Sequence, residues 1–423
     1  MPAPDLYVPL SEIDLSSAEF WQAPQDYREA AFRTLRTEDP IRFFAEPVPL
    51  DNAFEQGPGY FALTRYDDVW HASRNPQLFC SGKGSNIGDL PEFMLETLGS
   101  MINMDDPKHF RLRSIVSRGF TPKEVAKVEE YVRVKAKAAI DRLLEEFPNG
   151  ECDFVSEVAA PVPLQIICEM MGIPASDEPQ IFQWTNMILG VGDPEYVTTM
   201  DGLMGALIGM GQYATELGQS RLDNPTDDIT SVMMNAVVDG ERLSPQEFAS
   251  FFILLVVAGN ETTRNAISWG MKLLTDNPDQ RQIWWNDFDG TTRTAVEEIV
   301  RVATPVIHFR RTATEDTELS GVKIEAGQKV VLWYASANRD ETKWADPYAF
   351  EVRRDPTPQQ TGFGAGGPHF CLGANLARRE IGVVFDEIRR RVPDLTIIGE
   401  PAYLQSSFIH GIKRLPCAWT PPR

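Results

Sequence analysis

One uninterrupted helical pattern, from Pro245 to Asp276, constrains the fold of this chain more than any other feature. Ser244 and Glu247 form a capping box around a first-turn proline, and Asn277-Pro278 stops the pattern. A helix of this length extends roughly 48 Å, enough to cross a whole domain. Residues 251–257 are apolar on every side, so we expect the first half of the helix to be buried all round.

Small and polar residues interrupt this buried helix at Ala258-Gly-Asn-Glu-Thr-Thr263. Ala258 and Thr262 are four apart and share a face, whereas Glu261 lies one position round. Ala258 and Gly259 leave room for a group to lie against the backbone, and a buried acid beside a hydroxyl suits proton delivery. The alternative is a bent helix with a polar patch, because threonine hydroxyls bond back to the preceding turn.

The remaining patterns predict a mainly α fold with small β-sheets (α+β). Helical periodicity dominates residues 107–285. No repeat, low-complexity tract or linker divides the sequence, so we expect residues 1–423 to form a single domain. Strands are expected at residues 60–67 (ending in a turn), 308–312, 322–324 and 329–334.

The charge of the chain excludes one class of partner. With 40 Lys and Arg against 61 Asp and Glu, the formal net charge is −21, which argues against nonspecific binding of nucleic acid. Residues 1–14 are acidic and lack the apolar core of a signal peptide. The longest apolar run, residues 251–258, is far below the ~20 residues that span a bilayer. We therefore expect a cytoplasmic protein without a membrane anchor.

Cys371 is the residue whose surroundings most suggest chemistry. It lies in the glycine-rich stretch 362–373, directly before an amphipathic run at Ala374–Arg391. Glycines let backbone amides approach the sulfur, and a helix N-terminus lowers the pKa of a thiol, so we expect Cys371 to be anionic near neutral pH. Such a thiolate is either a nucleophile or a ligand for a soft metal centre. The other cysteines contain no C-x-x-C pair and predict neither a disulfide framework nor a zinc site; they are Cys80, Cys152, Cys168 and Cys417.

Two further pairs of residues share helix faces. His109 and Arg113 are four apart and can clamp one carboxylate or phosphate, although a solvated basic face gives the same spacing. Glu298 and Arg301 are three apart among apolar neighbours, which favours a buried ion pair that Arg354 can complete.

The glycine spacing Gly362-x-Gly364-x-x-Gly367 matches a dinucleotide-binding fingerprint only formally. Residues 355–361 before it are rich in Pro and Gln rather than forming a buried strand, so we reject that interpretation. A cysteine hydrolase is the stronger rival, with His369 two residues from Cys371, but it needs a third partner.

Together and in this order, the motifs resemble those of the cytochrome P450 haem-thiolate monooxygenases over nearly the whole chain. The I-helix pattern Ala/Gly-Gly-x-Asp/Glu-Thr is similar to residues 258–262, and Glu-x-x-Arg is similar to residues 298–301. The loop Phe-Gly-x-Gly-x-His-x-Cys-x-Gly is similar to residues 363–373, with one extra residue between Phe363 and Cys371. The resemblance implies one large, triangular, haem-binding unit.

The resemblance also implies how haem b would be held. Cys371 would be the axial ligand of the iron, with Phe363 placed over the sulfur. The haem carboxylates would need charge-assisted donors. The residues that match the family's donors are His109, Arg113, Arg311 and His369.

On the opposite side, the long helix would supply the oxygen-handling residues. Glu261 and Thr262 match the acid–alcohol pair that delivers protons, and Ala258 and Gly259 match the groove where oxygen sits. Glu298, Arg301 and Arg354 match a structural triad without a catalytic role.

The implied reaction inserts one atom of O2 into an unactivated C–H bond and releases the other as water. Electrons would come from NAD(P)H through a ferredoxin reductase and a small acidic ferredoxin. A basic patch would steer that ferredoxin, although ordinary surface cations are the alternative. The expected patch is Lys108, Arg111, Arg118, Arg378 and Arg379.

Residues 258–265, 295–301 and 408–413 are further similar to a bacterial group that oxidises terminal methyls of methyl-branched lipids and sterol side chains. We expect a branched fatty acid or isoprenoid as substrate, with a steroid side chain (C26) as the alternative. A peroxygenase or a non-catalytic haem gas sensor would not need the Glu261–Thr262 relay. The residues expected to line the apolar pocket are Leu254, Val257, Val306, Ile307 and Phe408.

Overall fold

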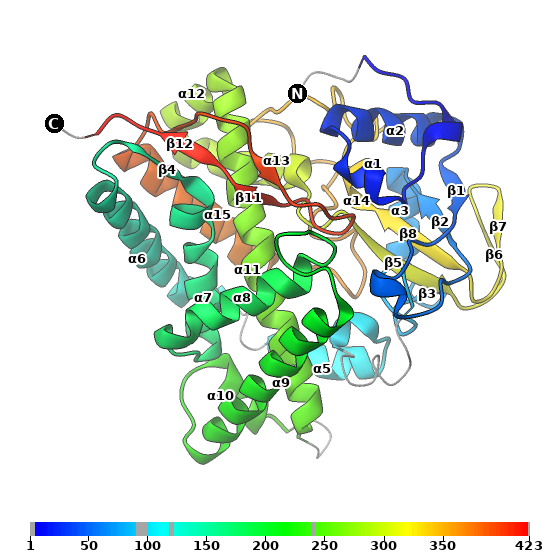
Figure 1. Cartoon of the computed structure of the whole chain (residues 1–423), viewed down its shortest axis with the longest axis horizontal. Coiled ribbons are helices and arrows are strands. Elements are labelled where there is room, and N and C mark those ends of the chain that lie inside the picture. The colour runs from blue at the N-terminus through cyan, green and yellow to red at the C-terminus, as the bar shows by residue number, and fades with distance from the viewer. Residues whose placement is uncertain (1–4, 90–99, 118–121, 238–241, 422–423) are drawn as a thin grey trace.

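The long helix of the sequence is helix α11 (Pro245–Asp276) in the computed structural model, which describes residues 5–89, 100–117, 122–237 and 242–421. The capping box is present: the Ser244 hydroxyl accepts from Glu247 N–H at 3.1 Å, and the Glu247 carboxylate accepts from Ser244 N–H at 2.9 Å. Figure 1 shows α11 running through the middle of the helical part of the molecule. Both predicted ends of the helix are therefore confirmed.

Most of the helices gather on one side of the molecule, and the largest sheet lies on the other together with the N-terminal helices (Figure 1). This confirms the predicted mainly α fold with small sheets. The predicted run Ala374–Arg391 is α15. The other helices are α1 (Ala18–Gln22), α2 (Gln25–Glu38), α3 (Tyr66–Arg74), α5 (Lys108–Ser117), α6 (Pro122–Glu146), α7 (Pro161–Met171), α8 (Glu178–Leu189), α9 (Met200–Asp223), α10 (Ile229–Asn235), α12 (Pro278–Asn286), α13 (Phe288–Ala303) and α14 (Tyr334–Ala337).

The largest sheet has the order β1-β2-β8-β5-β3, and only its β2–β8 pair is parallel. Its strands are β1 (Ile41–Phe44), β2 (Tyr60–Leu63), β3 (Phe79–Cys80), β5 (His308–Ala313) and β8 (Lys329–Trp333). A hairpin is formed by β6 (Thr317–Leu319) and β7 (Val322–Ile324), and another pair by β10 (Ala402–Tyr403) and β11 (Ile412–Arg414). A third sheet, in the order β4-β12-β9, consists of β4 (Glu151–Asp153), β12 (Pro416–Ala418) and β9 (Thr396–Ile397). The predicted strands at 308–312, 322–324 and 329–334 are thereby confirmed to within one residue. The strand predicted at 60–67 covers only Tyr60–Leu63, because helix α3 already begins at Tyr66.

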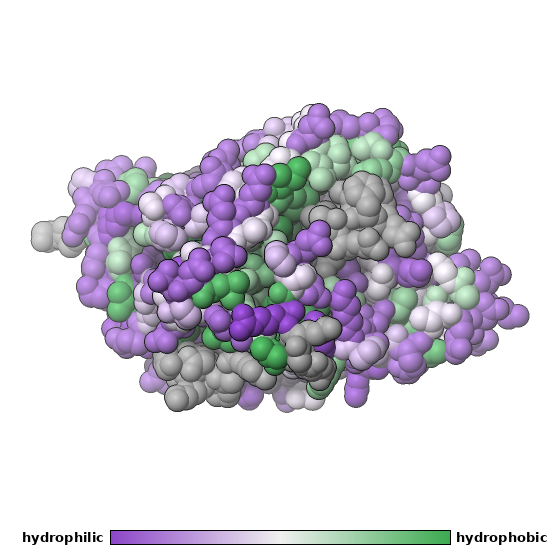
Figure 2. Space-filling view, turned by 90° about the horizontal axis from the view of Figure 1, so that it is seen from below, coloured by the Kyte–Doolittle hydropathy of each residue, from purple (hydrophilic) through white to green (hydrophobic). Residues whose placement is uncertain are grey.

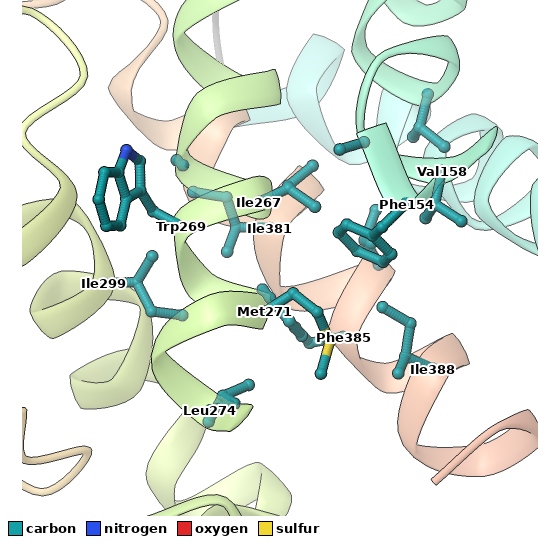
Figure 3. Packing of buried hydrophobic residues seen from close by; sticks show 14 of the residues in the cluster. Phe154, Val158, Ile267, Trp269, Met271, Leu274, Ile299, Ile381, Phe385 and Ile388 are labelled. Carbon is teal, nitrogen blue, oxygen red and sulfur yellow. The ribbon is translucent and has the colours of Figure 1, made fainter. Parts of the chain in front are cut away.

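The second half of α11 forms the centre of the largest core (Figure 3). Ile267 and Met271 pack among residues of α13, α15 and the segment after β4. A Cβ on Gly270 would lie 2.7 Å from the Phe385 ring, so glycine lets α15 approach α11 closely. This packing fixes the start of α15, and hence the cysteine just before it, relative to α11.

The predicted triad ties α13 to the segment that leads to the cysteine loop. Arg301 is 1% exposed and donates through Nε to Glu298 Oε2 at 2.7 Å, while Arg354 Nε donates to Glu298 Oε1 at 3.0 Å. Burial alone would raise the pKa of Glu298, but its two arginine partners outweigh burial and lower it. Arg301 also donates to the carbonyls of Asn338 and Pro347, at 2.8 and 2.7 Å. The triad is therefore a buried structural clamp.

The surface agrees with the acidic composition. Figure 2 shows a mainly hydrophilic face on which hydrophobic side chains gather only in small, separate groups. Among the helices that the structure describes, none combines the length and the apolar character required to cross a membrane.

Candidate active site

The cysteine loop depends on glycines for its path. Gly366 and Gly367 have φ of 73° and 75°, a left-handed conformation that favours glycine. A Cβ on Gly367 would lie 2.2 Å from the Ser73 carbonyl oxygen, so no larger residue fits there. The loop closes where Cys371 N–H donates to the Phe363 carbonyl at 2.9 Å. The extra residue is thus accommodated while Phe363 and Cys371 stay in contact.

The Cys371 sulfur accepts hydrogen bonds from nearby backbone amides, as the sequence predicted. N–H groups of Gly373 and Ala374 hydrogen-bond to it, and the positive side chains of Arg113 and Arg378 lie near it. The predicted direction of the pKa shift is nevertheless wrong for the thiol. Burial raises the pKa of Cys371, and the amides and arginines do not offset that effect. Metal coordination acts in the opposite sense, because it removes a thiol proton.

Cys371 in the cysteine loop and Ala258 in the middle of α11 are both accessible. Cys371 is surrounded by protein yet its surface is accessible. Ala258 is likewise exposed, although α11 is buried at Val257 and Asn260 on either side of it. Leu372, the residue after the cysteine, packs in one cluster with the first half of α11. The cysteine loop and the middle of α11 therefore border a common region.

Four nitrogen-bearing side chains converge beside the cysteine loop. The rings of His109 (α5) and His369 have centroids 4.3 Å apart. Burial, together with the positive charges of Arg311, His109 and Arg113, lowers the pKa of His369 to about 3. Arg311 comes from β5 and is buried, and Arg113 donates to the Phe370 carbonyl at 2.6 Å. The sequence placed two of these residues on one helix face, and the structure brings all four together.

This cluster lacks anionic partners for most of its donors. The Nδ1 of His109 lies 3.2 Å from Asp106 Oδ1, but its Nε2 is buried without any hydrogen-bond partner. Within the described ranges, neither Arg113 nor Arg311 forms an ion pair with a carboxylate; Arg311 donates only to the Arg310 carbonyl, at 2.7 Å. Buried donors without acceptors are costly, so this cluster is suited to bind carboxylates of another molecule.

In the middle of α11, the Glu261 carboxylate is buried whereas the Thr262 hydroxyl lies on the accessible side. The Thr262 hydroxyl donates to the Ala258 carbonyl at 2.8 Å, on the accessible side of the helix. Glu261 is 1% exposed; its Oε1 pairs with Arg264 and accepts from Asn265 at 3.0 Å, while its Oε2 has no partner. A Cβ on Gly259 would lie 3.0 Å from Ile167, so this glycine also allows α7 to approach α11.

The polar surroundings of Glu261 were missed in the sequence. Arg264 Nη1 donates to Asn186 of α8 at 2.9 Å, and Asn265 Oδ1 accepts from Ile412 N–H at 3.1 Å. The spacing of Glu261 and Arg264, three apart, was a readable signal for an ion pair. The partners from α8 and β11 were not readable, because they are far away in the sequence.

The predicted basic patch is largely neutralised. Arg379 pairs with Glu129 at 2.6 Å, Arg111 lies 3.8 Å from Glu247, and Arg378 pairs with Glu297. Arg378 also lies over the Phe363 ring, 4.5 Å from its centroid. Lys108 is exposed. Arg118, the remaining member of the patch, lies outside the described residues.

The residues expected to line the pocket divide into two groups. Leu254, Val306 and Phe408 are half-buried and thus available at a surface, whereas Val257 and Ile307 are buried. Ile307 N–H donates to the Phe408 carbonyl at 2.8 Å, which joins these two parts of the chain.

Comparisons with known proteins agree with the resemblance noted in the sequence. Residues 291–391 match the Cytochrome P450 family model. A Mycobacterium tuberculosis (strain ATCC 25618 / H37Rv) methyl-branched lipid omega-hydroxylase is 55% identical, with 98% of this chain and 96% of that protein covered. A Rhodococcus jostii (strain RHA1) steroid C26-monooxygenase is 39% identical, covering 95% and 83%. The solved structure of a Mycobacterium marinum cytochrome P450 in complex with pseudoionone is 40% identical, with a TM-score of 0.91 over 97% of this chain and 99% of that one.

The haem that this family carries fits the residues present. Its two carboxylates suit the unpaired donors of His109, Arg113 and Arg311, and its iron suits a cysteine sulfur held by backbone amides. The similarity extends over nearly the whole length of this chain and of the relative. The chain therefore belongs to the cytochrome P450 family and is a haem-dependent monooxygenase.

Proposed function

We propose that the protein is an omega-hydroxylase of methyl-branched lipids, which adds one oxygen atom to a terminal methyl group. The observation that carries this proposal is the 55% identity over 98% of the chain to relatives with that name. The relatives named for steroid C26 oxidation are 39–40% identical, so a steroid side chain is the second candidate. In this proposal residues 1–423 act as one haem domain in the cytoplasm.

The haem in this proposal is held from two sides. Cys371 would ligate the iron through its sulfur, presented by the loop that the hydrogen bond from Cys371 N–H to the Phe363 carbonyl closes. When bound, a thiolate-ligated haem supplies the activation of O2 for insertion into a C–H bond. The four converging residues would donate hydrogen bonds to the haem carboxylates; they are His109, Arg113, Arg311 and His369. The unpartnered His109 Nε2 supports this assignment.

Glu261 and Thr262 move protons in this proposal. Glu261 Oε1 is held by Arg264 and Asn265, which leaves Oε2 as the oxygen that takes up a proton. The Thr262 hydroxyl donates its hydrogen bond to the Ala258 carbonyl. The lone pairs of its oxygen are therefore available to accept a hydrogen bond on the accessible side. Ala258 keeps the accessible side of α11 small enough for oxygen to lie beside the backbone, whereas Gly259 faces Ile167 of α7.

Leu254, Val306 and Phe408 would bind the hydrocarbon part of the substrate. Their half-buried side chains are apolar, and burial of each substrate methylene is worth roughly 0.8 kcal/mol. A lipid chain can collect many such contributions, whereas a polar substrate cannot. This favours a long apolar substrate over a small polar one.

Electrons reach the site through separate redox proteins, as the family requires. We propose NAD(P)H, a ferredoxin reductase and a small acidic ferredoxin as the route. The docking surface would include α5, where Lys108 is exposed and Phe110 is 71% exposed. A cation beside an exposed aromatic ring suits a protein partner.

Product analysis tests the proposal. The purified enzyme, a ferredoxin and a reductase are incubated with branched fatty acids, isoprenoids, sterols and their unbranched analogues. We expect terminal hydroxylation of the branched lipids to be fastest. Faster steroid oxidation would favour the second candidate, and oxidation of only unbranched or aromatic compounds would contradict both. No product with any compound, despite reduction of the haem, would favour the non-catalytic sensor.

A further inference from the structure

Two cysteines far apart in the sequence lie opposite each other in the β4–β12 pair. The antiparallel register pairs Cys152 with Cys417, and their sulfur atoms are 3.5 Å apart. Phe154, two residues after Cys152, donates its N–H to the carbonyl of Leu415, two residues before Cys417, at 2.9 Å. Because hydrogen-bonded pairs alternate along antiparallel strands, the cysteine pair is also of this kind, with Cα atoms about 5.5 Å apart.

This geometry suits a disulfide. A disulfide needs Cα atoms about 4.4–6.8 Å apart, and the two sulfurs would have to approach by only about 1.5 Å. No other pair of cysteines within the described part of the chain has its sulfurs in contact. We propose that Cys152 and Cys417 are a thiol–disulfide site, which a small-molecule disulfide oxidises to a cross-strand bond.

The two cysteines have different roles in this exchange. Cys152 is half-buried and can be reached from solvent, whereas Cys417 is fully buried. The hydrogen bond with Cys152, together with burial, raises the pKa of Cys417. Because an oxidant in solution reaches Cys152 first, Cys152 is the thiol that attacks the oxidant.

The chemistry proceeds in two exchange steps. In the first, the Cys152 sulfur attacks one sulfur of the small-molecule disulfide, forms a mixed disulfide and releases one small thiol, which takes the Cys152 proton. In the second, the Cys417 sulfur attacks Cys152, releases the second small thiol and gives it its proton. Both cysteines are oxidised, the small disulfide is reduced to two thiols, and no further reactant is needed.

The bond would fasten the C-terminal segment to the helical core. The two cysteines are 265 positions apart, so the bond would close a very long loop and restrict the unfolded chain strongly. Figure 3 shows Phe154, which follows β4, in the same core as Val158 and as Ile388 of α15. The residues just before β12 make two further contacts with the rest of the molecule. Ile412 N–H donates to Asn265 of α11, and Lys413 Nζ lies 2.9 Å from Asp193 in the loop between α8 and α9.

Peptide mapping of the holoenzyme tests the site directly. The protein is incubated with oxidised glutathione or with dithiothreitol, free thiols are blocked, and the non-reduced digest is analysed by mass spectrometry. We expect a cross-linked peptide pair containing Cys152 and Cys417 only after oxidation. Cys80→Ser is the matched control, because Cys80 is also half-buried but its sulfur contacts no other cysteine within the described residues. The cross-link should persist in this variant and vanish in Cys152→Ser.

Thermal unfolding provides the second measurement. Oxidation should raise the Tm of the wild-type protein and of Cys80→Ser by at least about 2 °C, and should not raise that of Cys152→Ser. Glutathione remaining on Cys152 without a cross-link would overturn the proposal, because the second exchange would then be blocked. Modification of Cys80 with Cys152 and Cys417 both unreacted would overturn it as well.

Discussion

Replacing His109 with phenylalanine should weaken haem binding without weakening the fold. His109 is 2% exposed and its Nε2 has no partner among the described residues, so the protein itself loses little when the ring nitrogens are removed. The substitution does remove the 3.2 Å hydrogen bond to Asp106, whose side chain is 59% exposed. A hydrogen bond to a charged group contributes about 1.5–3 kcal/mol, which corresponds to roughly 10- to 150-fold weaker haem binding.

The assay measures how fast haem leaves the holoenzyme for an excess of a haem-scavenging protein. Urea unfolding of the haem-free protein is measured in parallel. His71→Phe is the matched control, because His71 is an exposed histidine on α3. A loss of affinity below about threefold, or an equal loss in His71→Phe, would refute the role of His109. So would destabilisation of the haem-free protein by as much as the lost binding energy.

Three further predictions follow from buried charges and histidines. Burial lowers the pKa of His308 to about 4 and that of His410 to about 3, whereas both titrate near 6.5 when unfolded. The unfolded state therefore binds more protons below pH 6.5, and His308 alone should cost about 3 kcal/mol of stability by pH 4, measured by urea unfolding. Arg301→Met should lower the free energy of unfolding by about 3–5 kcal/mol, because Glu298 stays buried with only Arg354. Glu261→Gln should lower turnover about 100-fold while substrate affinity, measured by the haem absorbance shift, stays unchanged.

Each of these predictions has a result that contradicts it. A stability that stays flat between pH 6.5 and 4 would show that the two histidines are not buried as neutral rings. An Arg301→Met protein as stable as wild type would mean that the triad is not a clamp. Loss of substrate binding in Glu261→Gln would assign this acid to packing of the pocket rather than to proton transfer.

Local signals in the sequence predicted the helices near the site well. The ends of α11 follow from Ser244, Glu247 and Asn277-Pro278, which act within one turn of the backbone. The spacing of His109 and Arg113 predicted that both lie on one helix, α5. Such features depend on neighbours in the sequence, so one sequence is enough to predict them.

Features that depend on distant neighbours were missed or predicted wrongly. The pKa of Cys371 was expected to fall, because the nearby amides were visible in the sequence and the burying residues were not. The contact between Cys152 and Cys417 depends on pairing of strands from opposite halves of the chain. The Asn186 and Ile412 partners of the Glu261 network likewise come from other elements.

The most direct test of the central claim is the absorbance spectrum of the reduced protein with carbon monoxide. We predict the red-shifted Soret band of a thiolate-ligated haem in the wild-type protein, and its loss in Cys371→Ala. Cys80→Ser should retain the band, since Cys80 belongs to β3 and not to the cysteine loop. A well-folded, haem-loaded wild-type protein without the red-shifted band would contradict the assignment of Cys371 as the iron ligand.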